Sequence, residues 1–356
     1  MEKVRLAIVG MGTMSQFHIM AVQNTPSVEL YALCDRHEDR VKPIAEKNNV
    51  KFWYNDYDEM LKNPSIDAVL VVTGNRYHAD CAIKALNAGK HVLCEKPIAA
   101  SAKEAVEMKN AADRNGKILM IAHEFRFSPA TSIVKEAVDN GQFGEVYYGK
   151  SVGHRRNGHP GGWFANKSIA AGGVMVDCGV HQLDNFMYIK GFPKATSVYA
   201  VTYNKIGTRS NVRSASLNYK SVSAGTEAVS DVEDLASALI RFEDGSTFSM
   251  EFSYAVNIES DYQEFSLFGT KMGSNYDGKR LKLFSEFNNY MTNISFETPT
   301  GGDWIKMLSN QMAHFGACVK GEAECLIPAA QCVEVMYILE AIYKSAELGH
   351  EVVIER

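Results

Sequence analysis

The sequence predicts an α/β protein in which an N-terminal doubly wound parallel sheet precedes an α/β domain with a large, mostly antiparallel open sheet. In residues 1–123, short apolar runs alternate regularly with helix patterns, which is typical of βαβ units. In residues 124–356, strand-like runs follow one another with few helices between them, which favours antiparallel pairing. The length of 356 residues suits two such domains better than one compact core.

The predicted strands of the first domain are apolar runs suited to a buried parallel sheet, and they cover residues 4–9, 28–34, 68–72, 91–94 and 118–122. The helices expected between them cover residues 13–24, 40–48 and 57–62, a segment that ends at 87, and 101–115. Asp56 and Ser101 are expected to cap helices, and Gly89 and Gly116 follow helix ends.

In the second domain, helices are expected at residues 129–140, 174–189, 303–320 and 329–348. Strands are expected at residues 145–153, 196–203, 234–242, 247–254 and 264–269. Residues 204–230 are rich in Ser, Thr and Asn, and their pattern assigns them to no element.

The first strand runs into a turn that is typical of dinucleotide binding. Gly10 permits a tight turn, and Gly12 lets a pyrophosphate approach backbone N–H groups at the positive end of the next helix. That helix starts with Thr13 and Met14, which we expect beside the cofactor. Ser15 replaces the third glycine of the pattern and is small enough for close helix packing. With a strand before it and a helix after it, this turn predicts nucleotide binding.

Asp35 ends the second strand, about twenty positions after the glycines. Its carboxylate can accept hydrogen bonds from the adenosine ribose and would repel a 2′-phosphate, so NAD is favoured over NADP. NADP stays possible because the neighbouring Arg36 guanidinium could hold that phosphate or stack on the adenine. The alternative is that Arg36 and His37 are solvated loop charges.

The composition is that of an ordinary globular protein, with 46% hydrophobic and 22% charged residues. A net charge of -5 gives no reason to expect nucleic acid or an anionic membrane as a partner. No stretch reaches the length of a membrane span, and a strand that begins at Val4 leaves no room for a signal peptide. The seven scattered cysteines lack a C-x-x-C pair, which favours reduced thiols in the cytoplasm and no metal site.

Glu95, Lys96 and Pro97 follow the strand at 91–94, on the sheet edge where ligands of doubly wound folds bind. A lysine at this edge can hold a substrate hydroxyl and favour its deprotonation. The alternative is an exposed lysine before a turn-making proline.

Asp177 and His181 lie four positions apart on an expected helix, so their side chains share one face. A carboxylate fixes the orientation of an imidazole and stabilises its protonated form, which suits a proton carrier near neutral pH. Asp184 continues the same face three residues later. The alternatives are a surface ion pair, or a metal-ligand couple that lacks its third member.

Several short motifs accompany these residues. They are Thr73-Gly74-Asn75 with His78, Cys94-Glu95-Lys96-Pro97, Gly172-Gly173 ahead of Asp177 and His181, and Phe268-Gly269-Thr270-Lys271. Together with the N-terminal turn they make the whole chain resemble the Gfo/Idh/MocA family of oxidoreductases, of which glucose–fructose oxidoreductase and inositol 2-dehydrogenase are members. The resemblance implies an NAD(P)-binding Rossmann domain at 1–123. It also implies a substrate-binding and oligomerisation domain at 124–356, whose open sheet packs against another subunit to give a homodimer or homotetramer.

The resemblance also implies roles for individual residues. Lys96 would bind the reacting hydroxyl and the nicotinamide ribose, His181 would be the general base, and Asp177 would orient His181 or contact the substrate. The residues expected along the cofactor are Thr73, Asn75, His78 and Glu95, although His78 is also plausible as a helix-start residue with no ligand role. The Lys96–Pro97 peptide bond is often cis in relatives.

Residues 154–163 precede the helix that carries Asp177 and could line the substrate pocket. Trp163 could stack on a sugar face, and Arg155 or Arg156 could bind hydroxyls or a carboxylate. Arg126, at the start of the second domain, could also reach the site. The alternative is a mobile surface loop. Acidic or phosphorylated sugars therefore stay possible as substrates.

Oxidation of an alcohol removes a hydride and a proton. The first domain offers the hydride acceptor, and Lys96, Asp177 and His181 offer a route for the proton. Together with the resemblance, which implies the substrate class, this predicts an oxidoreductase that transfers a hydride between a nicotinamide cofactor and a hydroxyl or keto group of a sugar, cyclitol or related polyol. The alternatives are an NAD-dependent glycosidase of the same superfamily and a non-catalytic nucleotide or sugar sensor. A pure sensor would not need the three proton-handling residues together.

Overall fold

The computed structural model describes residues 3–207, 209, 219–225, 229–297 and 299–356, which divide into two compact units. The first unit contains Met1–Glu124, Ser168–Ala171 and Trp304–Met336. The second contains Phe125–Lys167, Gly172–Asp303 and Tyr337–Arg356. The first unit thus includes Trp304–Met336, a segment that a division into residues 1–123 and 124–356 assigns to the second domain.

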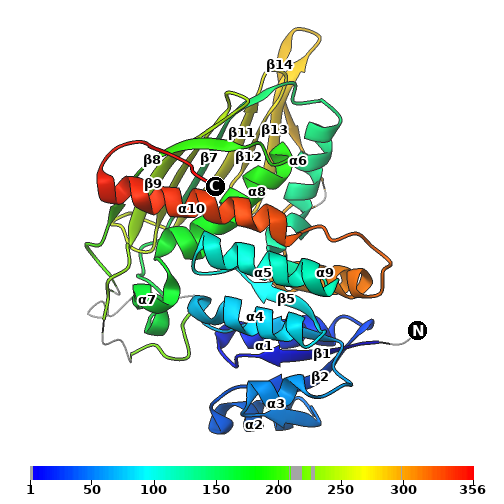
Figure 1. Ribbon diagram of the computed structural model, residues 1–356. Helices are drawn as coiled ribbons and strands as arrows, with labels where there is room; N and C mark the ends of the chain where they lie inside the picture. The colour runs from blue at the N-terminus through cyan, green and yellow to red at the C-terminus, as the bar shows by residue number, and fades with distance from the viewer. Residues whose placement is uncertain (1–2, 208, 210–218, 226–228, 298) are drawn as a thin grey trace. The chain divides into compact units, whose positions relative to one another are not determined.

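The first unit is built on a parallel sheet of six strands in the order β3-β2-β1-β4-β5-β6 (Figure 1). Its strands are β1 (Val4–Val9), β2 (Val28–Cys34), β3 (Phe52–Tyr54), β4 (Ala68–Val71), β5 (His91–Glu95) and β6 (Leu119–Ala122). Every neighbouring pair in this order is parallel, which confirms the predicted doubly wound sheet. The sequence pattern does not predict β3, because only three half-buried aromatic residues mark it.

Helices connect these strands as the alternation predicts. They are α1 (Thr13–Gln23), α2 (Glu38–Lys47), α3 (Tyr57–Leu61), the short 3-10 turn η1 (Asn75–Tyr77), α4 (His78–Asn87) and α5 (Ala102–Asn115). The cap predictions are confirmed, since Asp56 accepts the N–H of Glu59 and Ser101 accepts that of Glu104. Helix α9 (Trp304–Val319) packs against α1 and completes the unit.

The second unit is built on a nine-stranded sheet in the order β14-β13-β12-β11-β7-β10-β9-β8-β15. Its strands are β7 (Val146–His154), β8 (Ala195–Tyr203), β9 (Leu235–Phe242), β10 (Thr247–Ser253), β11 (Tyr262–Gly269), β12 (Gly273–Tyr276), β13 (Leu281–Phe287), β14 (Tyr290–Ser295) and β15 (Val352–Val353). The β7–β10 pair is parallel and the other pairs are antiparallel, as predicted for a mostly antiparallel sheet. The sequence pattern does not predict β12 to β15.

The helices of the second unit lie mainly before β8 in the sequence. They are α6 (Pro129–Asp139), the 3-10 turn η3 (Gly162–Ala165), the π-helical segment η4 (Met175–Gly179) and α8 (Val180–Lys190). Segments η2 (Glu124–Phe127), α7 (Lys167–Ala170) and α10 (Ala329–Leu348) each have residues in both units. Helix α8 packs on β7 and α6, and its Val180, Leu183 and Met187 are buried.

The sequence pattern leaves residues 204–230 unassigned and predicts no membrane-spanning segment. Of the unassigned stretch at 204–230, residues 208, 210–218 and 226–228 lie outside the described residues. In the part of the chain that the structure covers, no helix is both long and apolar enough to span a bilayer.

Candidate active site

The turn between β1 and α1 has the geometry of a phosphate-binding turn. Gly10 has φ +95°, and a Cβ at this position would lie 2.5 Å from the Val72 carbonyl oxygen, so only glycine fits. Gly12 is the N-cap of α1, has no side chain to cap the helix, and a Cβ there would meet no atom within 4 Å. Ser15 donates to the Gly12 carbonyl oxygen at 2.7 Å, which ties the turn to the helix. Backbone N–H groups at this open helix start suit a pyrophosphate.

Asp35 stands at the end of β2, beside this turn, and is buried. Its carboxylate accepts the Met11 N–H at 2.7 Å and the His37 N–H at 3.0 Å. A carboxylate has about four lone-pair sites, so it can also accept ribose hydroxyls. Exposed Arg36 donates to the His37 ring at 3.1 Å, while Arg40, which the sequence pattern does not single out, lies 3.8 Å from Asp35. These residues fit the adenosine end of an NAD molecule.

His78 and Asn75 follow β4 and hold neighbouring loops. The Asn75 amide donates to the Ala170 carbonyl oxygen at 2.7 Å. His78 is wholly buried, with Nδ1 2.8 Å from the Pro97 carbonyl oxygen and Nε2 3.2 Å from that of Thr73. Burial lowers the pKa of His78, which favours the neutral ring; a neutral ring carries one N–H, donates to one of these two carbonyl oxygens and packs against the other. This geometry favours the alternative for His78, a structural brace between two loops, over contact with the cofactor.

Lys96 follows β5 at the same edge of the sheet and is half-buried. The Lys96–Pro97 peptide bond is cis. The Lys96 N–H donates to Glu95 Oε2 at 3.0 Å, and Glu95 Oε1 lies 2.5 Å from Nε2 of the buried His18 on α1. The ends of β1, β2 and β5 therefore gather the predicted turn, Asp35 and Lys96 at one edge.

In the second unit, Asp177 lies in the π-helical segment η4 and His181 in the first turn of α8. A π turn spaces side chains differently from an α-helix, so the expectation that both residues share a regular α-helical face is wrong in detail. Asp177 accepts the hydroxyl of Tyr254 at 2.8 Å and the Cys178 thiol at 3.6 Å. Both Asp177 and His181 are half-buried, and the His181 ring lies 5.1 Å from that of Phe125.

The Gly172–Gly173 motif is explained by the buried carboxylate of Glu233. This carboxylate accepts the N–H groups of Gly173 at 2.8 Å and Met175 at 3.1 Å, and the hydroxyl of Tyr343 at 2.7 Å. A Cβ on Gly173 would collide with Glu233, and one on Gly172 with Tyr343. Burial raises the pKa of Glu233 although these three donors oppose the shift. The motif therefore lets Glu233 hold the start of the segment that carries Asp177.

Arg155 belongs to the same part of the second unit as Asp177. It is exposed just after β7, and the neighbouring Cys178 and Asp177 raise the pKa of its guanidinium. The ring of His159 meets that of Tyr254 edge-on at 6.2 Å. Arg155, Asp177 and Tyr254 thus form a polar cluster with one exposed cation.

The remaining predicted substrate residues differ in their surroundings. Arg156 is exposed, and its guanidinium donates to the Glu259 carbonyl oxygen. Trp163 lies in η3, is half-buried and stacks on Phe164 with ring centroids 3.9 Å apart. Both remain candidates for substrate contacts.

The structure contradicts the expectation that Arg126 reaches the substrate. Its side chain is completely buried and forms two hydrogen bonds with Asp184, at 2.9 Å and 2.6 Å. The guanidinium also lies 4.8 Å from the Tyr188 ring centroid. A buried, bidentate ion pair of this kind holds α8 in place. Asp184 is consequently a structural residue as well.

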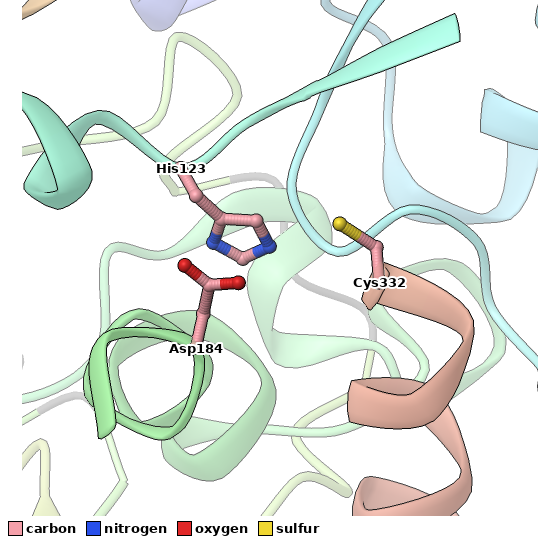
Figure 2. A group of neighbouring side chains, drawn as sticks. All are labelled: His123, Asp184 and Cys332. Carbon is pink, nitrogen blue, oxygen red and sulfur yellow. The ribbon is translucent and has the colours of Figure 1, made fainter. Parts of the chain in front are cut away.

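Figure 2 labels Asp184 on α8 of the second unit, and His123 after β6 and Cys332 on α10, which belong to the first unit. A ring nitrogen of His123 lies within 4.8 Å of the Cys332 thiol. Sequence reasoning singles out neither residue for chemistry.

Four residues of these sites carry no signal in the sequence pattern: His18, Arg40, Glu233 and Tyr254. Tyr254 ends a predicted strand and Glu233 precedes one, but nothing local distinguishes them from core or loop residues. Their partners are 60 to 77 positions away for Glu233–Gly173, His18–Glu95 and Tyr254–Asp177, so only the fold reveals them.

Comparison with known proteins identifies the family of the chain. Residues 4–123 match the oxidoreductase family with an NAD-binding Rossmann fold, Gfo/Idh/MocA, and residues 132–273 match the C-terminal domain of the same family. The chain is 32% identical to D-glucoside 3-dehydrogenase of Escherichia coli strain K12, over 98% of this chain and 97% of that protein. It is also 32% identical to scyllo-inositol 2-dehydrogenase (NAD(+)) of Bacillus subtilis strain 168, over 53% and 55% of the two chains.

Among solved structures, levoglucosan dehydrogenase in complex with NADH shares the fold, with a TM-score of 0.87 over 100% of both chains at 21% identity. The full-length relative and the two family domains agree on the same assignment. The chain belongs to the Gfo/Idh/MocA family of oxidoreductases, with an NAD-binding Rossmann fold at residues 4–123.

Proposed function

We propose that this oxidoreductase oxidises a ring hydroxyl of a D-glucoside or related sugar, with NAD as the hydride acceptor. The broader class, hydride transfer between a nicotinamide cofactor and a hydroxyl of a sugar or cyclitol, follows from its family and relatives. The observation that carries the narrower proposal is the 32% identity to a D-glucoside 3-dehydrogenase across nearly the full length of both chains. That similarity covers the substrate half as well as the cofactor half.

The first unit supplies the cofactor site in this proposal. The open first turn of α1, including Thr13 and Met14, binds the pyrophosphate, and Asp35 binds the adenosine ribose. The Asp35 carboxylate disfavours a 2′-phosphate, which is the reason for NAD as the preferred cofactor. Bound NAD supplies a nicotinamide carbon that accepts the hydride.

Proton transfer is assigned to three side chains. Lys96 donates a hydrogen bond to the reacting hydroxyl and so stabilises negative charge on its oxygen. His181 takes the proton as general base. Asp177, held by the Tyr254 hydroxyl, orients His181 or contacts a neighbouring substrate hydroxyl. Arg155 and Trp163 are the proposed sugar-binding residues, Arg155 because it is exposed beside Asp177.

We also assign the open sheet of the second unit to homodimer or homotetramer formation. Its strands expose large apolar side chains, among them Tyr147, Tyr199 and Leu239, at 51%, 49% and 42% of their areas. Such exposed apolar side chains on a sheet are typical of a contact surface between subunits.

The experiment measures reduced nicotinamide formed by the purified protein on a panel of D-glucosides, aldoses, inositols and sugar acids. NAD and NADP are compared in parallel, and Lys96→Ala is the control. We expect turnover with a glucoside and NAD, and a loss of at least about 100-fold in Lys96→Ala with the dissociation constant of NADH changed less than about threefold.

Other outcomes of this panel would contradict the proposal. Unchanged turnover in Lys96→Ala would remove the assigned role of Lys96. Cleavage of the glycoside without accumulated NADH would indicate the glycosidase, and NADH binding without any turnover would indicate the sensor.

A further inference from the structure

His18 is a buried imidazole in the helix that starts at the cofactor turn. It lies on α1, three residues after Ser15, and its side chain has no exposed area. Nε2 lies 2.5 Å from Glu95 Oε1. Its other nitrogen, Nδ1, is buried and has no hydrogen-bond partner among the residues that the structure describes. The polar contact of the ring is therefore directed at Glu95.

The direction of this hydrogen bond follows from Glu95. Its second oxygen, Oε2, accepts the backbone N–H of Lys96 at 3.0 Å. An ionised carboxylate only accepts hydrogen bonds, so with Glu95 ionised the proton of this contact lies on His18 Nε2, which donates. The Glu95 side chain is 10% exposed, so it cannot replace this donor fully with water.

We propose that His18 is a positioning residue for the dehydrogenase reaction. It fixes the Glu95 carboxylate, which in turn fixes the backbone from which the Lys96 side chain starts. The inference rests on the proposed function of Lys96, because it explains how a long, flexible lysine keeps one geometry. It adds that the His18–Glu95 contact connects the helix that binds the cofactor to the residue before Lys96, so that the cofactor and the substrate hydroxyl keep a fixed relative position.

A role in packing alone would predict a different residue at this position. The site is completely buried, and an apolar side chain would fill it without leaving a polar atom such as Nδ1 unpaired. A histidine with one unpaired nitrogen is explained if the donor at Nε2 is what matters.

The test uses two substitutions that separate the donor from the ring. The amide nitrogen of His18→Gln reaches the position of Nε2 and can still donate, whereas the shorter amide of His18→Asn cannot reach Glu95. Thr25→Val is the matched control, because Thr25 is also buried beyond the other end of α1 and donates to the Ala21 carbonyl oxygen at 2.8 Å. Wild type and Lys96→Ala are measured beside them.

The first readout needs neither cofactor nor substrate. Hydrogen exchange of the Lys96 amide is followed by mass spectrometry with residue-level fragmentation. We expect about tenfold faster exchange in His18→Asn, and exchange close to wild type in His18→Gln and Thr25→Val.

The second readout is kinetic. We expect kcat to fall about 10- to 100-fold in His18→Asn, with the dissociation constant of NADH changed less than about threefold, and to recover to within about threefold of wild type in His18→Gln. Equal losses of kcat in His18→Asn and His18→Gln would show that His18 acts through packing alone. Wild-type amide exchange and wild-type kcat in His18→Asn would show that His18 does not position Lys96. A wild-type protein with no turnover would defeat the proposed function, whereas the exchange measurement would still decide the inference.

Discussion

The cofactor edge of the first unit and the helix start of the second are built in different ways. The cofactor edge is the edge of the parallel sheet at which β1, β2 and β5 end. Backbone geometry places its residues, because each of these strands leads into a residue or turn of the proposed site. In the second unit, side chains from distant segments position Asp177. Tyr254, directly after β10, donates to the Asp177 carboxylate, and Glu233, before β9, accepts backbone N–H groups just ahead of Asp177. The cofactor edge thus consists mainly of backbone positions, to which His18 and Glu95 add one side-chain contact, whereas hydroxyl and carboxylate groups from distant segments hold Asp177 and the backbone ahead of it.

Removing the Tyr254 hydroxyl is the sharpest way to test this difference. Burial, followed by the nearby Asp177 carboxylate, raises the pKa of Tyr254 well above its usual range, so the phenol stays a hydrogen-bond donor at working pH. We expect Tyr254→Phe to lower kcat about tenfold, equivalent to about 1.4 kcal/mol, because Asp177 loses its charge-assisted hydrogen bond. The dissociation constant of NADH should not change. Steady-state kinetics and NADH titration measure both.

Tyr276→Phe is the matched control for that prediction. Tyr276 ends β12 of the same sheet, its hydroxyl donates to the Gly278 carbonyl oxygen at 2.9 Å, and it is not one of the proposed site residues. We expect less than about a twofold change in kcat. Equal losses in the two variants, or a wild-type rate in Tyr254→Phe, would contradict the role given to Tyr254.

A smaller effect is expected from His78, which braces two loops of the first unit. Burial lowers its pKa in the folded protein, so the unfolded chain takes up a proton first as the pH falls. The stability contributed by neutral His78 is therefore complete above about pH 6.5 and is lost as the pH falls below it toward the folded-state pKa. We expect His78→Gln to be less stable than wild type at pH 7.5 and to lose less additional stability on acidification to pH 5.

Urea unfolding at several pH values measures this difference, with Lys84→Gln on the exposed side of α4 as the control. A variant as acid-sensitive as wild type would show that His78 does not contribute to the acid response. Loss of NADH binding in a folded His78→Gln protein would restore the interpretation of His78 as a cofactor residue.

The contrast between positions set by the backbone and positions set by distant side chains also explains which parts of the site could be predicted from the sequence. The placement of Gly10, Asp35 and Lys96 at one sheet edge could be predicted, because each follows an apolar run within two residues and parallel strands carry such positions to one edge. The strands β12 to β14 could not be predicted, because their residues are largely half-buried or exposed and show little apolar alternation. Arg126 was a wrong prediction because a buried arginine is recognised only by its partner, Asp184, which lies 58 positions away.

The helix around Asp177 shows the same limit on a smaller scale. Its apolar residues Val176, Val180 and Leu183 recur at helical spacing and are buried. This spacing does not reveal that residues Met175–Gly179 wind as a π-helix, in which Glu233 accepts the Met175 N–H and Asp177 accepts the Tyr254 hydroxyl. Motifs that act through the backbone are therefore predictable from sequence, whereas the side chains that orient them are not.

The central claim is direct hydride transfer from a sugar carbon to NAD, and an isotope measurement tests it most directly. The protein is incubated with NAD and a D-glucoside that carries deuterium on every ring carbon, and the NADH formed is analysed by mass spectrometry. We predict NADH that contains one deuterium in its nicotinamide ring. NADH without deuterium, or glycoside cleavage with no net NADH, would contradict the account.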